Sequence, residues 1–557
     1  MSVRVVSAAL ALWVMVTNGV LASGEQDVSN NDIQHQVSTN ALKTEERALA
    51  DLSVGMNAFI LTPSNNRTDI HFNLPPNVDA TEAWLRLAAR PASTTTNGNI
   101  HVSINNGDAI TIRPEARAME ARFALFSSDL HPGENTLTIS YSTETASAGW
   151  IVDATRSRLR LTLDENRPIA SLEELETTLS ADFAAPRRIA LISDVSRQRA
   201  TLEGLVAQGI ALRAGSVPIF SGETHNADLI IRIAENGRLE TTDRELLRNG
   251  RNSQGPEIAF SNDGDVRLII TGRNIDEAAA AARLFAARSF VGYDQTFLAA
   301  DAVAAHRLGQ RQTRDARNMV AGETDLRTFA TSGLPFSADQ GSRTAVQIAG
   351  RNDTDRYGAL SVLARAALVS GEAWLYAWYG ESHDTVPAGH NVLVIGPDFE
   401  TNTLVERSAP AELHAAMRAA ERSRGQRGLM RFAAAAYADN GDTSSPLNNL
   451  GVAALFANKD DPGHWVATLT APDLASFEAA GRSLARSDLW QALEGRAAVW
   501  SERGVTPYDF SYIAPTFNER VQEFAVDHTR DAAFVLFGLA FFMLIRGIWR
   551  RRRVHAT

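Results

Sequence analysis

Two apolar segments, one near each end of the chain, limit most strongly what this sequence can fold into. The N-terminal segment, residues 1–22, carries a positive charge at Arg4, continues with an apolar stretch over residues 5–16 and ends in small residues before Ser23. This pattern is typical of a signal peptide, because its apolar part is too short to cross a bilayer comfortably. An uncleaved N-terminal anchor is the alternative interpretation.

The second apolar segment predicts one transmembrane helix over residues 530–549, because residues 532–545 are apolar throughout and a span needs ~20 residues. Arginines dominate the tail over residues 550–557, which predicts a cytoplasmic C-terminus. A buried helix of a soluble domain is the alternative. The residues expected to approach a partner helix or to reach the membrane interface are Ala533, Gly538, Ala540, Arg546 and Trp549.

The composition of the segment between these ends excludes several classes of function. A chain of 557 residues is too long for a single core, so several domains are expected. The net charge of -11 argues against a nucleic-acid partner. The chain has no cysteine, which excludes disulfides and thiol nucleophiles. For an exported protein, this composition fits the bacterial periplasm.

The first domain is predicted to be a β-sandwich. Residues 23–53 are polar and read as a disordered lead-in. Residues 54–165 then hold short alternating segments such as 69–74 and 158–163, with turn sequences such as Asn105-Asn106-Gly107 between them. This pattern predicts a jelly-roll β-sandwich of the kind found in carbohydrate-binding domains.

Two α/β domains are predicted to follow. Short apolar strands alternate with helices over residues 166–300 and again over residues 324–505, on either side of a charged linker at 301–323. This alternation predicts flavodoxin-like domains with largely parallel sheets. The predicted fold class is therefore a jelly-roll β-sandwich, two flavodoxin-like α/β domains and one C-terminal transmembrane helix. Residues 506–529 hold a group of aromatic residues (Tyr508, Phe510, Tyr512 and Phe517), and Val521, Phe524, Ala525 and His528 then recur at helical spacing. This pattern predicts an amphipathic helix on the membrane surface; a plain aromatic linker is the alternative.

The two predicted α/β domains contain a local sequence echo. Thr271-Gly272-Arg273-Asn274 precedes an alanine-rich helix that Asn274 is expected to cap, and Thr470-Ala471-Pro472-Asp473 precedes a second such helix. Arg283 and Arg482 lie in step within these helices. The echo suggests a duplicated domain.

Carbohydrate contact is the chemistry that the strand pattern favours most. Sugars stack their C–H faces on aromatic rings while polar neighbours bind the hydroxyls. Alternation places Trp84 beside Arg86 on one face, and His71 beside Asn73 on another. Burial in a core is the alternative for the tryptophans. The candidate contact residues are Trp84, Arg86, His71, Asn73 and Trp150.

The sequence shows no motif for catalysis or for a cofactor. It contains no glycine-rich phosphate loop, no nucleophile elbow and no histidine cluster with metal-ligand spacing. A flavodoxin-like fold does not by itself imply flavin binding. No catalytic residue, metal or cofactor is therefore expected.

Several stretches, taken in order, resemble the B subunit family of bacterial cellulose synthase. They are residues 102–107, residues 126–137, Gly149-Trp150-Ile151-Val152-Asp153 with residues 157–159, residues 489–495, and Val499-Trp500. The resemblance implies a non-catalytic periplasmic subunit, held in the bacterial inner membrane by a single span. Its partners would be the membrane glycosyltransferase (catalytic A) subunit and the nascent glucan, with self-association as a further expectation.

This chain departs from the family pattern in one respect. Residues 301–323 leave no room for the second jelly roll of other members, so the chain resembles a shortened member whose polymer need not be cellulose. The family also carries the name of cyclic-di-GMP-binding regulatory protein. Arg546 and Arg550 have R-x-x-x-R spacing, but the accompanying [DN]-x-S-x-x-G motif is missing, so direct binding is not expected. The rival hypothesis is an extracytoplasmic glycan-modifying enzyme that uses an α/β domain; it would need a carboxylate pair or a nucleophile triad.

Overall fold

The computed structural model describes residues 42–508 with internal gaps. The gaps are 54–55, 95, 116, 145–147, 166, 196, 248–254, 263–264, 288–296, 300–323, 349–352, 382, 398–401, 411–412, 414–450 and 472–473. The predicted signal peptide at 1–22, the linker at 301–323 and everything beyond 508 lie outside the described residues, and so do the predicted interfacial segment from 509 onward, the membrane helix and the tail.

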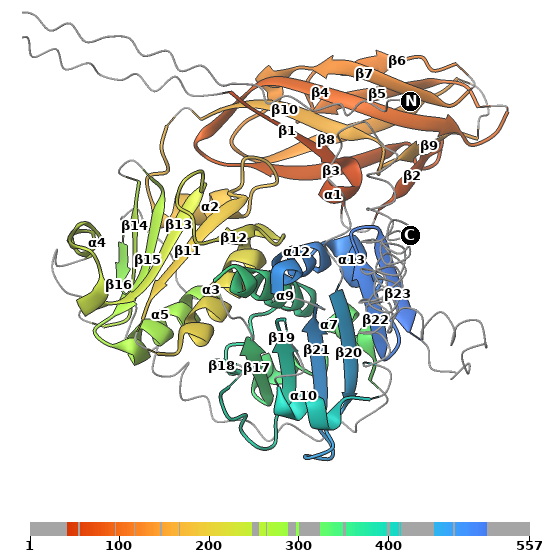
Figure 1. The fold of residues 1–557 in the computed structure, drawn as a ribbon. Coiled ribbons are helices and arrows are strands. Elements are labelled where there is room, and N and C mark those ends of the chain that lie inside the picture. The colour runs from red at the N-terminus through yellow and green to blue at the C-terminus, as the bar shows by residue number, and fades with distance from the viewer. Residues whose placement is uncertain are drawn as a thin grey trace, which may run out of the picture. The chain divides into compact units, whose positions relative to one another are not determined.

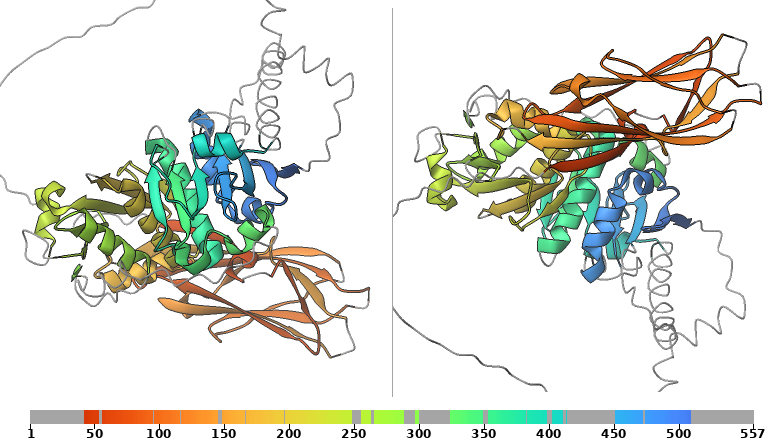
Figure 2. Two further views of the ribbon diagram at one scale, coloured as in Figure 1. Left: turned by 90° about the horizontal axis from the view of Figure 1, so that it is seen from below. Right: turned by 90° about the horizontal axis from the view of Figure 1, so that it is seen from above.

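The first domain is a sandwich of two antiparallel sheets, drawn in red and orange in Figures 1 and 2. The larger sheet has the order β1-β10-β4-β9-β2, with β7 paired to the other edge of β4. Its strands are β1 (Lys43–Ala48), β2 (Ala58–Leu61), β4 (Val78–Pro91), β7 (Met119–Leu125), β9 (Trp150–Asp153) and β10 (Arg158–Glu165). The smaller sheet is β3 (Arg67–Leu74), β8 (Gly133–Ser142), β5 (Asn99–Ile104) and β6 (Ile110–Ile112).

Alternation of apolar and polar residues builds this sandwich. Leu85 and Leu87 of β4 and Ile139 of β8 are fully buried in one core that both sheets share. Their neighbours along each strand point outward, because successive side chains of a strand leave on opposite faces. At the turn after β5, Asn105 and Asn106 adopt positive φ, as the expected Asn-Asn-Gly hairpin requires.

The predicted lead-in at residues 23–53 is wrong over its last part. Residues 43–48 form β1, which completes the larger sheet by pairing with β10, and residues 49–52 form α1 (Leu49–Leu52). Glu45 is buried and bonded to Arg187, which explains how such a polar segment can be ordered. The polar composition of residues 43–48 gave no sign of a strand, because the buried carboxylate of Glu45 is stabilised by Arg187, 142 residues away in the sequence.

The second domain has a mixed sheet with the order β12-β11-β13-β15-β14-β16. The first four of these strands are parallel, and β14 and β16 run antiparallel to their neighbours. The strands are β11 (Arg188–Asp194), β12 (Ile219–Ser221), β13 (Leu229–Glu235), β14 (Glu257–Ser261), β15 (Arg267–Gly272) and β16 (Phe297–Ala299). The helices are α2 (Leu172–Leu179), α3 (Arg199–Ala214), α4 (Thr241–Glu245) and α5 (Ile275–Ala286), with a short 3-10 turn at Asn236–Arg238. A second 3-10 turn, at Ser127–Asp129, belongs to the sandwich.

The third domain repeats this order with one further hairpin strand, as β18-β17-β19-β21-β20-β22-β23. The strands are β17 (Thr344–Ile348), β18 (Trp378–Glu381), β19 (Asn391–Ile395), β20 (Gly451–Ala457), β21 (Trp465–Thr470), β22 (Ala497–Ser501) and β23 (Gly504–Tyr508). The helices are α7 (Leu326–Ser332), α8 (Ala338–Gly341), α9 (Asp353–Ser370), α10 (Thr403–Ser408), α12 (Leu474–Leu484) and α13 (Ser487–Gln491). Again four parallel strands precede antiparallel ones.

These findings correct the predicted fold class. In each mixed sheet, an antiparallel strand lies beyond the four parallel ones, in place of the wholly parallel sheet of a flavodoxin-like domain. In the part of the chain that the structure describes, no helix has the length and apolar character to cross a membrane. The predicted single-pass helix, and the inner-membrane localisation that depended on it, are therefore not supported; residues 530–549 themselves are not described.

The sequence echo corresponds to a structural repeat. Asn274 caps α5 as expected, accepting hydrogen bonds from the N–H groups of Asp276 and Glu277. Arg283 of α5 donates to the carbonyl of Leu375, next to β18, and Arg482 of α12 donates to the carbonyl of Phe220 in β12. Each arginine thus reaches the opposite domain, Arg482 at the edge strand β12 and Arg283 just before the equivalent edge strand β18.

Helices α3 and α9 join the two mixed-sheet domains, and one hydrophobic core runs through both. Gln208 of α3 donates to the Tyr379 hydroxyl at 2.8 Å and accepts from the Trp374 N–H at 2.9 Å. Burial raises the pKa of Tyr379 far above its usual range, so the hydroxyl stays protonated and donates to the Trp374 carbonyl. The two domains therefore share a closely packed, hydrogen-bonded joint.

Candidate functional site

The outer surface of the larger sandwich sheet carries the most distinctive group of side chains. Strand pairing places Arg160 of β10, Trp84 of β4 and Ala124 of β7 side by side in one row. The next row holds Arg158, Arg86 and Arg122 in the same three strands. Residues directly opposite in antiparallel strands point to the same side of a sheet. We call the surface formed by these two rows the Trp84 face.

Trp84 is half-buried, and its ring interacts with an arginine. The guanidinium carbon of Arg122 lies 4.7 Å from the centroid of the Trp84 ring, within the range of a cation–π contact. Such a contact holds the arginine over the aromatic surface without using its N–H groups. The guanidinium therefore covers part of one face of the ring, and the part of the half-buried ring that it leaves open stays accessible beside it.

Arg86 belongs to a charged network at the edge of the Trp84 face. Its Nε donates to Glu120 at 2.5 Å, and Arg156 donates to the other oxygen of Glu120 at 2.8 Å. The hydrogen bond from Arg86 is the main reason that the pKa of Glu120 lies below the usual range of glutamate. Both arginines keep exposed N–H groups, since 48% of the Arg86 side chain and 64% of the Arg156 side chain remain accessible.

A groove of about 600 Å³ adjoins this network. Ala58, Ala88 and Ala89 line it with little side-chain bulk. The polar residues that line it are Asn57, Arg90, Glu120, Asp153, Thr155 and Arg156. The volume lies within the ~300–1,000 Å³ typical of ligand sites.

The structure brings together only some of the predicted contact residues. Trp84 and Arg86 share the Trp84 face, as alternation predicted. His71 and Asn73 are exposed on β3 in the other sheet. The His71 ring contacts Thr136 and Glu134, and the Asn73 N–H donates to Asp182 at 2.7 Å. These two residues therefore belong to a different surface.

Trp150 is not a surface residue. Its side chain is fully buried in the sandwich core, where Trp150 pairs in register with Leu61 and Pro91. The prediction of a sugar platform at this position is therefore corrected. The other predicted contact set, the membrane and partner residues Ala533, Gly538, Ala540, Arg546 and Trp549, lies outside the described residues.

Sequence reasoning missed Glu120, Arg122 and Arg156, which complete the Trp84 face and its network. A signal was present, because Glu120 and Arg122 alternate with apolar neighbours in β7. The pairing of β7 with β4 places them beside Trp84, and the pairing of distant segments cannot be predicted from local periodicity.

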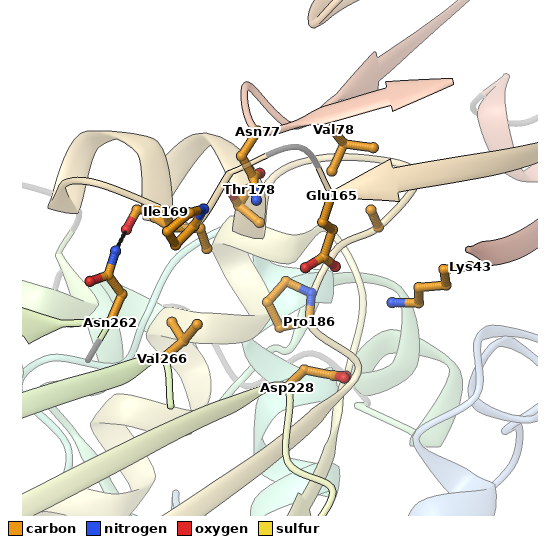
Figure 3. A pocket seen from close by; sticks show the side chains of 12 residues that line it. Lys43, Asn77, Val78, Glu165, Ile169, Thr178, Pro186, Asp228, Asn262 and Val266 are labelled. Atoms are coloured by element: carbon orange, nitrogen blue, oxygen red, sulfur yellow. Dashed lines mark hydrogen bonds between the residues drawn. The ribbon is translucent and has the colours of Figure 1, made fainter. Parts of the chain in front are cut away.

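A second cavity, of about 290 Å³, lies between the sandwich and the start of the second domain (Figure 3). Asn77 is 4% exposed and lines it; its Nδ2 donates to the Arg167 carbonyl, whereas its Oδ1 has no partner among the described residues. Asp228 accepts from the N–H groups of Arg187 and Arg188. A lone acceptor of this kind is satisfied by one water as well as by a ligand, so the cavity indicates no ligand class.

No group of three or more metal-ligating side chains occurs in the described part of the chain. Besides Glu120, Asp153 is the other carboxylate of the groove. Its hydrogen bond from the Thr155 hydroxyl is the main cause that lowers its pKa, and the N–H groups of Thr155 and Arg156 add to this. Both carboxylates are thus held in the ionised form.

No protein-family model matches this chain, and no curated protein matches it. Parts of it are similar to solved structures. A family 35 carbohydrate-binding module from Clostridium thermocellum aligns at 13% identity over 21% of this chain and 98% of the module, with a TM-score of 0.16. A second such module, from Cellvibrio japonicus, aligns at 17% identity over 20% of this chain and 98% of its own length, with a TM-score of 0.13.

An exo-β-1,3-galactanase from Phanerochaete chrysosporium also shows a partial match. It aligns at 16% identity over 22% of this chain, with a TM-score of 0.14. The match spans about a quarter of the galactanase, 26% of its length. TM-scores of this size establish neither a shared overall fold nor a shared function.

Proposed function

We propose that this protein is a non-catalytic glycan-binding subunit of a polysaccharide synthase. The observation that carries this proposal is the Trp84 face, where an aromatic ring, paired charges and a groove adjoin on one sheet surface. The partner would be a glycosyltransferase that delivers the polymer. Support for that partner comes from the order of sequence stretches that resemble the B subunit family of cellulose synthase.

The chemistry of the Trp84 face suits a sugar chain. A pyranose has apolar C–H faces, which stack on an indole ring, and a rim of hydroxyls, which hydrogen-bond to planar charged groups. Trp84 supplies the ring, and the exposed N–H groups of Arg86 and Arg156 supply donors. Glu120 holds these two arginines in place, so less conformational freedom is lost when a ligand binds.

The same groups favour binding over hydrolysis. A glycosidase needs one carboxyl group that stays protonated near neutral pH, which requires a raised pKa. Glu120 and Asp153, the carboxylates of the groove, have lowered pKa values instead. Neither is suited to act as a general acid, so we propose a binding role with no bond chemistry.

Trp84→Ala is expected to weaken glycan binding about fivefold, which corresponds to ~1 kcal/mol for one aromatic contact. Because part of the Trp84 ring is already in water, the same change should lower the free energy of unfolding by only about 1–2 kcal/mol. Isothermal titration with oligosaccharides measures the first quantity, and chemical denaturation measures the second.

His71→Ala is the matched control, since it removes an exposed ring from the opposite sheet. We expect it to leave the affinity unchanged. Equal binding by wild type and Trp84→Ala, or a loss confined to His71→Ala, would refute the assignment of the Trp84 face.

A further inference from the structure

A row of arginines, which repel one another, crosses the Trp84 face. Arg158, Arg86 and Arg122 are directly opposite one another on three adjacent strands. Side chains in this relation start only ~5 Å apart, and like charges placed there destabilise a sheet. Arg160 lies two residues from Arg158 on the same side of β10, which adds a fourth positive charge.

The carboxylates nearby neutralise this row only in part. Glu120 serves both Arg86 and Arg156, and Glu46 lies 3.5 Å from Arg158. Among the described residues, no salt bridge joins a carboxylate to Arg90, Arg122 or Arg160, although Glu46 of β1 lies directly opposite Arg160 in the sheet. Glu82 precedes Trp84 by two positions, so it lies at the end of the face away from Arg86 and Arg90.

This local excess of positive charge is opposite in sign to the whole chain. The protein carries a net charge of -11, so general composition does not account for a basic surface. Like-charged groups that cost folding energy and lie beside a groove indicate a ligand that neutralises them. Arginine is also the side chain whose planar fork fits a carboxylate with two parallel hydrogen bonds.

We propose that the glycan held on the Trp84 face is an anionic polysaccharide that carries carboxylate groups, as uronic acid residues do. Arg122, whose guanidinium lies over the Trp84 ring, and Arg90, six residues farther along β4, receive carboxylates of the glycan chain. This inference rests on the proposed function, since it specifies the class of glycan that the same face binds. It makes a neutral glucan the weaker ligand.

The test compares an oligogalacturonate with the same oligosaccharide after methyl esterification of its carboxyl groups, by isothermal titration of the full chain. The acidic form should bind at least tenfold more tightly, and the difference should shrink as salt is raised from about 0.05 to 0.5 M. Arg90→Gln and Arg122→Gln should each weaken binding of the acidic form about fivefold and leave the ester unaffected.

Arg197→Gln is the matched control, because it removes an exposed arginine from the second domain; it should change neither affinity. If the ester and the acid bind equally and the arginine variants behave as wild type, the anionic inference is overturned while the proposed function stands. If neither form nor a neutral glucan binds, both fail. A single-stranded oligonucleotide that displaces the acid at equal concentration would also overturn the inference, because the face would then recognise charge alone.

Discussion

Trp150→Ala should lower the free energy of unfolding by about 3–5 kcal/mol, the range for truncating a fully buried tryptophan. The side chain is completely enclosed by both sheets of the sandwich, so its removal leaves a cavity that the surrounding strands cannot close. Urea denaturation followed by circular dichroism measures this loss. Domains that unfold separately would show it in one transition only.

The variant Trp150→Phe distinguishes the contribution of the aromatic ring to stability from that of the indole N–H group. The N–H of Trp150 is buried and has no hydrogen-bond partner among the described residues. Replacing it should therefore cost no hydrogen bond, and the loss should stay well below that of the alanine variant. An alanine variant as stable as wild type would show that Trp150 is not a core residue.

Arg356→Met should destabilise the joint between the two mixed-sheet domains by about 3–5 kcal/mol, because it leaves a buried carboxylate without one of its partners. Glu203 of α3 is fully buried, and its carboxylate lies 3.1 Å from Arg356 Nε of α9 and 2.7 Å from Arg199 Nε. Arg356 also bonds to Glu381 of β18. Thermal and chemical denaturation of the full chain measure the effect.

The double variant Glu203→Met with Arg356→Met tests the electrostatic reason for this loss. When both charges are replaced by apolar side chains, the fully buried carboxylate is gone. Only Glu381 and Arg199 then lose a partner, and both side chains are partly exposed, so most of the stability should return. A double variant as unstable as Arg356→Met alone would mean that the loss of stability comes from packing and not from the Glu203 carboxylate left without Arg356.

The sequence predicted most reliably which face of a sheet a side chain takes, because that depends only on alternation within its own strand. Alternation in β4 correctly places Trp84 and Arg86 on the face opposite Leu85 and Leu87. The same rule could have excluded Trp150, because it shares its side of β9 with Val152, which is buried, whereas Asp153 faces the groove.

Features that depend on pairing between distant segments were not predictable from local pattern. Arg122 lies on Trp84 because β7 pairs with β4, and nothing near Arg122 in the sequence specifies that pairing. The antiparallel direction of β14 and β20 was missed for the same reason: an apolar run reads alike in either direction, and only the neighbouring strand shows which one it takes. The ordered β1 was missed because Glu45 depends on Arg187 of the next domain.

The central claim, that the outer surface of the larger sandwich sheet binds a glycan, is tested most directly by mapping which side chains the glycan covers. The full chain is labelled with an arginine-specific reagent and a tryptophan oxidant, with and without saturating oligogalacturonate, and the modified positions are identified by mass spectrometry. We predict that the oligosaccharide protects Trp84, Arg90 and Arg122 and leaves Arg197 unchanged. Saturable binding that leaves Trp84, Arg90 and Arg122 as reactive as before would contradict the claim.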